Sequence, residues 1–482
     1  MGVPPVGLMY RVNVDGAVFF SQKTAGVGVV IRDNEGNFIA GLSKKLHAPL
    51  GAIETEAKAF EAGIAFAGEI GIWDFVQERG KCEICYTTEM RMDYTSTTLF
   101  LAVLLFASAV ADDISHESLC KSMVETKGYI CEEHKVTTKD GYILGVQRIP
   151  VGRTSKMANR PPVLLQHGIL MDAATWLFNS PNKSLAFILA DNGFDVWMGN
   201  NRGTISSRGH TSLSAIDPAY WDWTWEQLVS DDLPAMYDYI HNQTGQKLYY
   251  VGHSLGTLLA LASFSQEKLV NMTKSAALLC PIAYTGQVTS MFPRAIANTF
   301  LAEGTYMLGL REFISGGSVV GKLLEGVCHL PLIDCSNLVS TIAGPNCCIK
   351  PSTYDVFLDH APQSTSTKNM IHLSQMLRAG NVAKYDYGDE SENMKRYGQS
   401  TPPLYNLTRI PKDIPLFMGY GGADSLSDVN DVNRLLDNIK DHQKDKLVLQ
   451  YRDNYAHFDF VMAENARSVV YDPLLAFLRT HA

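Results

Sequence analysis

The stretch that most constrains the fold is residues 247–256, KLYYVGHSLG. Its Leu-Tyr-Tyr-Val run predicts a buried strand, and the apolar residues 257–262 after it predict a helix. Gly252 and Gly256 permit a backbone that turns sharply and passes close to its neighbours. The pattern G-x-S-x-G arises by chance in roughly one of five or six chains of this length. It is therefore the strand, turn and helix around Ser254 that make this residue the candidate nucleophile.

Short apolar runs alternate with helical patterns from residue 112 onward. Two runs joined by a Lys-Asp-Gly turn, 133–138 and 142–149, predict a hairpin. The other predicted strands are 162–166, 194–198, 247–251, 276–283, 415–419 and 447–451. Strands that alternate with helices indicate a mostly parallel sheet with helices on both faces. The fold class that we predict for residues 112–482 is therefore α/β.

This alternation stops between about residues 285 and 405. An interruption of that length is better explained by a cap domain than by a loop. A group of cysteines falls inside it: Cys328, Cys335, Cys347 and Cys348. No histidines are spaced beside them as zinc ligands would be, so we expect disulfides, and the pairing stays open. Cys280 lies in an apolar run and is expected to be a buried free thiol.

A serine nucleophile needs a base and an acid that orients the base, and in this type of fold the acid precedes the histidine. Asp424 lies in the loop after the strand 415–419 and is the candidate acid, with Asp428 in the same loop as its rival. His457 follows the last predicted strand and is the candidate base. His442 precedes that strand and is expected at the surface. His253 neighbours the nucleophile and is expected to point away from it and serve packing.

The negative charge that develops during acyl transfer needs two backbone N–H donors. One is Leu255, directly after the nucleophile, and the other is expected to be Ile169, in the loop after the strand that ends at His167 and Gly168. None of these roles calls for a metal or a cofactor.

Residues 8–78 form a separate pattern, with a strand at 11–17, a hairpin over 26–41, a helix at 53–69 and a strand from 74. The motif VNVDGA, the hairpin and the E-A-K-A helix resemble the first half of the ribonuclease H-like domains of plants. The resemblance implies that Asp15 and Glu56 match two metal-binding carboxylates. A further Asp of that family is replaced by Glu78-Arg-Gly, and the later elements are missing. We therefore expect a truncated ribonuclease H-like fragment whose two carboxylates are vestigial and bind no metal.

Residues 90–111 have the features of a secretory signal peptide. An apolar core at 98–106 is followed by Ala109-Val-Ala111, and the core is short for a membrane-spanning helix. Translation of the downstream domain is therefore expected to start at Met90 or Met92. N-glycosylation sequons follow at Asn182, Asn242, Asn271 and Asn406, none in a predicted strand. These features predict export through the secretory pathway, to the outside or to a vacuole or lysosome.

From about residue 117 to 481 the chain resembles the acid lipases, the group of gastric and lysosomal acid lipases and their secreted plant relatives. The similarity rests on the motifs LLQHGIL (164–170), NKSLAFILADNGFDVWMGNNRG (182–203), LPAMYDYI (233–240), TGQKLYYVGHSLGT (244–257), PPLYNLTRI (402–410), GGADSLSDVNDV (421–432) and AHFDF (456–460). It implies an α/β-hydrolase core with a cap and lid, hydrolysis of triacylglycerols or sterol esters, no metal, and a triad at Ser254, Asp424 and His457. Animal members have Gln after the nucleophile, where this chain has Leu255, and one cap disulfide near Cys328 and Cys335 with different spacing.

The partners that we expect are a lipid ester and the lipid–water interface, for a monomeric enzyme. A net charge of -9 without a Lys/Arg-rich block argues against a nucleic-acid partner. Two alternatives remain. One is a carboxylesterase for water-soluble esters, and the other is a nucleic-acid-binding or ribonuclease H-type activity of residues 8–78.

Overall fold

The structure, a computed structural model, describes residues 10–19, 24–33, 35–46, 62–63, 66–67, 75–79, 118–154, 159–314 and 335–481. The chain divides into two units, Met1–Asp93 and Tyr94–Ala482. Among the predicted features, Glu56, Cys328 and the segment 90–111 lie outside the described residues.

The first unit contains a four-stranded sheet in the order β3–β2–β1–β4. Its strands are β1 (Tyr10–Phe19), β2 (Thr24–Arg32), β3 (Phe38–Leu46) and β4 (Phe75–Arg79). β1 pairs antiparallel with β2 and parallel with β4. Alternate residues such as Val12, Val14, Val27 and Val29 are buried, since successive side chains of a strand point to opposite faces. Asp15 lies within β1.

The second unit is built on a nine-stranded sheet in the order β15–β14–β11–β10–β7–β8–β6–β5, with β9 beside β6. The strands are β5 (Glu132–Thr137), β6 (Tyr142–Ile149), β7 (Pro162–Gln166), β8 (Asp195–Gly199), β9 (Gly209–His210), β10 (Leu248–His253), β11 (Thr273–Leu279), β14 (Leu416–Gly421) and β15 (Leu447–Arg452). The pairs from β15 to β8 are parallel, and β6 is antiparallel to its neighbours. The predicted α/β class is thus confirmed. The strand predicted at 276–283 ends earlier, because Cys280 has a positive φ of 53° and Pro281 follows.

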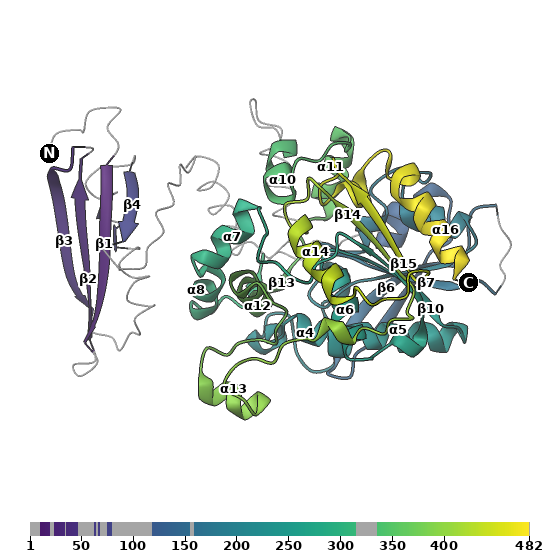
Figure 1. The fold of residues 1–482 in the computed structure, drawn as a ribbon, viewed down its shortest axis with the longest axis horizontal. Coiled ribbons are helices and arrows are strands. Elements are labelled where there is room, and N and C mark those ends of the chain that lie inside the picture. The colour runs from purple at the N-terminus through teal and green to yellow at the C-terminus, as the bar shows by residue number, and fades with distance from the viewer. Residues whose placement is uncertain are drawn as a thin grey trace. The chain divides into compact units, whose positions relative to one another are not determined.

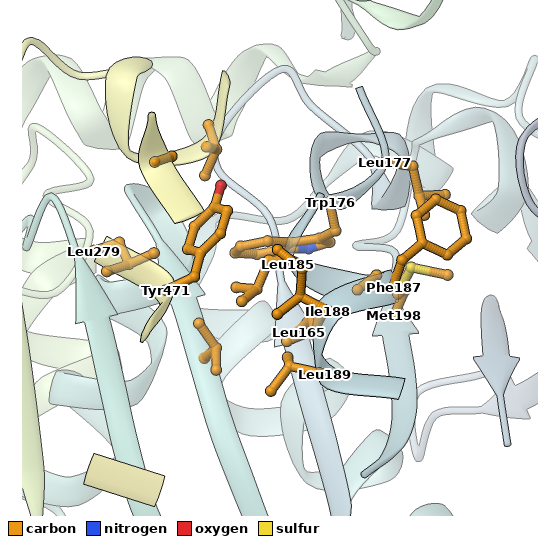
Figure 2. Packing of buried hydrophobic residues seen from close by; sticks show 14 of the residues in the cluster. Leu165, Trp176, Leu177, Leu185, Phe187, Ile188, Leu189, Met198, Leu279 and Tyr471 are labelled. Carbon is orange, nitrogen blue, oxygen red and sulfur yellow. The ribbon is translucent and has the colours of Figure 1, made fainter. Parts of the chain in front are cut away.

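Helices cover both faces of this sheet (Figure 1). Those outside the interruption are α3 (Leu185–Asp191), α4 (Trp225–Gln227), α5 (Leu233–Thr244), α6 (Leu255–Ser265), α14 (Val429–Asn438), α15 (Asp459–Met462) and α16 (Asp472–Thr480). Successive residues of β7 enter different cores: Leu165 joins the one shown in Figure 2 with Trp176 and Tyr471, whereas Leu164 packs with α5 and α6. Burial on both faces explains why the inner strands β7, β8, β10, β11 and β14 are continuous apolar runs rather than alternating ones.

We call residues 285–405 the cap segment. It contains α7 (Met291–Asn298), α8 (Leu301–Met307), β12 (Glu312–Phe313), α10 (Cys335–Ala343), α11 (Pro351–His360), β13 (Thr365–Ser366), α12 (Thr367–Ala379) and α13 (Glu390–Tyr397). α7, α8 and α12 lie together at one side of the second unit (Figure 1), around the buried side chains of Ile296, Ala302 and Ile371. The short strands β12 and β13 pair antiparallel.

Two disulfides and one free thiol are described. Cys347 pairs with Cys348, and Cys120 pairs with Cys131. The second of these bonds was not predicted from the sequence. Cys280 is free and buried, which confirms the prediction for it. In the described part of the chain, no helix is both long and apolar enough to cross a membrane.

Candidate active site

Ser254 lies at the sharp turn between β10 and α6. Its φ of 54° and ψ of -119° lie outside the helical and extended regions, a strained geometry for a residue with a side chain. The turn is packed too closely for larger residues at its two glycines. A Cβ on Gly256 would lie 2.4 Å from the carbonyl oxygen of Gln166, and one on Gly252 would lie 2.8 Å from that of Gly256. The glycines thus allow the helix to approach β7 while Ser254 is held at the tip.

The loop after β7 passes directly against the serine. A Cβ on Gly168 would lie 2.9 Å from the Cβ of Ser254. His167 fixes this loop: its Nδ1 lies 2.8 Å from the carbonyl oxygen of Gly168, and the N–H of Asn201 donates to its Nε2 at 3.1 Å. Burial lowers the pKa of His167 to about 4, so the ring is neutral at physiological pH and Nδ1 carries the proton.

The two candidate donors for an oxyanion are the residue after Ser254 and a residue of the loop that follows β7. Leu255 is the first residue of α6, so its N–H has no partner in a preceding helical turn. Ile169 follows Gly168 in the loop that lies against the serine. The N-terminal end of α6 also carries the positive end of the helix dipole, which favours an anion there.

Asp424 and His457 meet through their side chains. The Nδ1 of His457 lies 2.9 Å from Oδ2 and 3.1 Å from Oδ1 of Asp424, and both side chains are buried. Oδ1 also accepts the backbone N–H groups of Leu426 and Ser427. Burial alone would raise the pKa of Asp424, but the His457 ring and the N–H donors outweigh it and hold the pKa below its ordinary value. The carboxylate is therefore ionised, and it can orient the imidazole and stabilise its protonated form.

The rival acid, Asp428, has a different task. It is the N-cap of α14, and its carboxylate accepts the backbone N–H of Asn430 at 2.8 Å. The carboxylate that pairs with His457 is that of Asp424.

Two other histidines, His442 and His253, were singled out in the sequence. His442 is only 6% exposed, and its Nε2 lies 2.8 Å from the carbonyl oxygen of Ile414, so the prediction of a surface residue was wrong. The segment after α14 turns back onto the residues before β14, and a carbonyl satisfies the buried ring. His253 is buried as expected, but it does more than fill space. Its Nε2 lies 3.0 Å from the backbone carbonyl oxygen of His457, and burial lowers its pKa to about 3.

Two side-chain groups in the described residues have the composition of a metal site, and both are engaged otherwise. In the first, His253 and Cys280 contact the carbonyl oxygen of His457, whose own ring pairs with Asp424. In the second, Cys347 and Cys348 form a disulfide beside Asp459. Neither group presents a free ligand set.

A mixed, mostly parallel sheet with a serine on a strained strand-to-helix turn defines an α/β-hydrolase. Comparison with protein families agrees. Residues 161–460 match the model described as "alpha/beta hydrolase fold", and residues 120–180 match "Partial alpha/beta-hydrolase lipase region". In the first unit, residues 13–96 match the model described as "Reverse transcriptase-like".

Curated relatives define the class further. The chain is 52% identical over 368 residues to triacylglycerol lipase 2 of Arabidopsis thaliana, covering 76% of this chain and 88% of the relative. It is 40% identical over 389 residues to triacylglycerol lipase 1 of the same plant, covering 80% and 96%. It is 38% identical over 362 residues to human lipase member K, covering 73% and 89%. The chain belongs to this lipase family, the acid lipases, as its sequence motifs indicated.

Proposed function

We propose that residues 112–482 hydrolyse acyl esters of lipids, namely triacylglycerols or sterol esters, with residues 285–405 acting as a cap domain. Ser254 is the nucleophile, His457 the base and Asp424 the orienting acid. The observation that carries this proposal is the pairing of the buried His457 ring with Asp424 in a fold whose elbow presents Ser254. The names of the relatives support the lipid substrate.

In the proposed reaction, the Oγ of Ser254 attacks the ester carbonyl while the Nε2 of His457 takes its proton. The N–H groups of Leu255 and Ile169 stabilise the oxyanion. His457 then protonates the leaving alcohol, which leaves an acyl group on Ser254. Water, deprotonated by the same histidine, hydrolyses this acyl-enzyme and releases the fatty acid. No metal or cofactor takes part.

A lipid–water interface as partner is supported by the surface of the cap segment. Large apolar side chains are exposed on and around α7 and α8: Met291, Phe300, Met307, Leu308 and Leu310. Leu308 is 79% exposed, and five such residues within one short stretch exceed the scattered exposure usual for a globular surface. We infer that this part of the cap segment meets the lipid and that the enzyme acts as a monomer without a nucleic-acid partner.

Export through the secretory pathway, to the outside or to a vacuole or lysosome, is part of the same proposal. Support comes from the sequons, because all four asparagines are exposed and accessible to glycosylation: Asn182, Asn242, Asn271 and Asn406. Disulfides such as Cys120–Cys131 also suit an oxidising compartment.

The first test is Ser254→Ala. The variant should fold normally and lose about 10⁴-fold or more in kcat, because only the oxyanion donors and substrate binding would remain. Ser265→Ala is the matched control, since Ser265 is a buried serine at the end of the same helix, with its Oγ bonded to the carbonyl of Ala262. If Ser254→Ala kept a tenth of the wild-type kcat, the assignment of the nucleophile would be wrong.

The second test separates a lipase from a water-soluble carboxylesterase. Hydrolysis is measured against acyl chain length, below and above the solubility limit of each ester. A lipase should gain activity when long-chain esters form an interface. Activity confined to short, dissolved esters would favour the carboxylesterase.

A further inference from the structure

A short piece of the cap segment, residues 343–348, lies across the two loops that carry the candidate acid and base. We call it the strap. The carbonyl oxygen of Ala343 accepts the backbone N–H of Ser425 and that of His457, each at 3.2 Å. Ser425 follows Asp424 directly. One carbonyl of the cap segment therefore bridges the acid loop and the base itself.

The strap lies against the acid loop without space between them. Gly344 has a φ of +96°, and a Cβ on it would lie 2.0 Å from the carbonyl oxygen of Ala423. A side chain at this position would force the strap away from residues 423–425. The contact therefore depends on glycine both for its conformation and for its size.

The far end of the strap is anchored by Asp459, the second residue after His457. This carboxylate is fully buried and accepts three backbone N–H groups. Ala456 and Cys347 donate to Oδ2 at 2.8 and 3.1 Å, and Cys348 donates to Oδ1 at 3.2 Å. In the described part of the chain, no basic side chain pairs with it. Both oxygens are thus committed to joining the strap to the residue that precedes His457.

We propose that Asp459 is a positioning residue for the hydrolysis, because through the strap it fixes the backbone of His457 relative to Asp424. The inference rests on the proposed function and adds a residue to it. Ala343 contacts the His457 N–H, while His253 and Cys280 contact the His457 carbonyl oxygen, so its peptide backbone is bound on both sides. If the strap moves away, the contact of Ala343 with the N–H of His457 is lost. The imidazole of His457 can then shift relative to Ser254 and Asp424.

The test is Asp459→Asn. An asparagine has one acceptor oxygen, and its amide nitrogen would face at least one of the three N–H groups, so the anchor is broken without a change in size. We expect kcat for a soluble short-chain ester to fall by about 10- to 100-fold, the effect of a misplacement of about 1 Å, with KM within about twofold. The rate at which an organophosphonate labels Ser254 should fall in parallel, while the final labelled fraction stays near that of the wild type.

Asp431→Asn is the matched control. Asp431 is also buried and also accepts a backbone N–H from the edge of the cap segment, that of Gln287 at 2.7 Å, but it has no contact with the His457 loop. Asp431→Asn should also lower the thermal stability, but it should leave kcat within about twofold. Equal losses of kcat in both variants would mean that any weakened contact of the cap segment lowers kcat, which would overturn the proposal. Wild-type kcat in Asp459→Asn would overturn it as well.

If Asp459→Asn does not fold, Gly344→Ala tests the same strap from its other end. Its Cβ would push the strap off the acid loop, and the same fall in kcat at constant KM is expected. Wild-type kcat in Gly344→Ala would then refute the role of the strap. The Ser254→Ala result stands apart from both, because activity without Ser254 would refute the proposed function itself.

Discussion

Replacing Asp424 by asparagine should change the proton position on His457 rather than the shape of the site. In the wild type, Oδ1 of Asp424 accepts the N–H groups of Leu426 and Ser427 at 2.8 and 2.7 Å. In Asp424→Asn the amide oxygen must keep this place, because an NH₂ group there would face two donors. The NH₂ group therefore points at the Nδ1 of His457 and donates to it.

A histidine that accepts at Nδ1 carries its proton on Nε2, the nitrogen that should take the proton of Ser254. The base is then in the wrong tautomer, and the protonated imidazole loses its stabilising charge. The same substitution in a comparable triad lowers kcat by about 10⁴. This fold-change corresponds to about 5.5 kcal/mol of transition-state stabilisation, at ~1.4 kcal/mol per factor of ten.

The assay is kcat on a soluble ester at constant enzyme concentration, with Asp428→Asn as the comparison. Asn and Asp cap helices equally well, so Asp428→Asn should keep the N-cap of α14 and alter kcat by less than about twofold. Similar losses in the two variants, or more than a tenth of wild-type kcat in Asp424→Asn, would refute this reasoning.

Two further predictions concern the free energy of unfolding and the N-terminus of the secreted enzyme. Replacing Cys120 and Cys131 together by serine should lower the free energy of unfolding by about 3 kcal/mol, because the bond closes a short loop in the unfolded chain. Urea unfolding measures this, and a loss below about 1 kcal/mol would contradict it. Expression of residues 90–482 beside 1–482 in plant cells should yield secreted, active enzyme that begins at or near Asp112. Secreted enzyme that keeps residues 8–78 attached would show that the first unit has a role in the mature protein.

Much of the fold was predictable because each central strand of the second unit is buried on both faces. The continuous apolar runs predicted at 162–166 and 415–419 correspond to β7 and β14, and every residue of these two strands is buried. The candidate acid and base could also be chosen from the sequence. Parallel strands end at the same edge of the sheet, and the two residues follow β14 and β15, which are neighbours there.

Contacts made by the backbone could not be predicted in this way. The sequence motif AHFDF pointed to His457, but the three N–H groups that bind Asp459 come partly from Cys347 and Cys348, which have no sequence pattern in common with it. His442 was predicted to lie at the surface, but it is buried, and its Nε2 is hydrogen-bonded to the backbone carbonyl oxygen of Ile414. The Cys120–Cys131 bond was not predicted, because the pairing of nine cysteines cannot be deduced from their spacing in the sequence.

The order of strands in the sheet also affects how the protein is made. β11 pairs with β14, but residues 280–415 separate them in the chain. At a synthesis rate of about 5–20 residues per second, the edge of β11 waits about 7 to 27 seconds before β14 has been made. An open strand edge is prone to wrong pairing, so the nascent chain is exposed to such pairing during this interval. Asp424 and His457 are both made after β14, and catalytic competence is therefore the last property that the growing chain acquires.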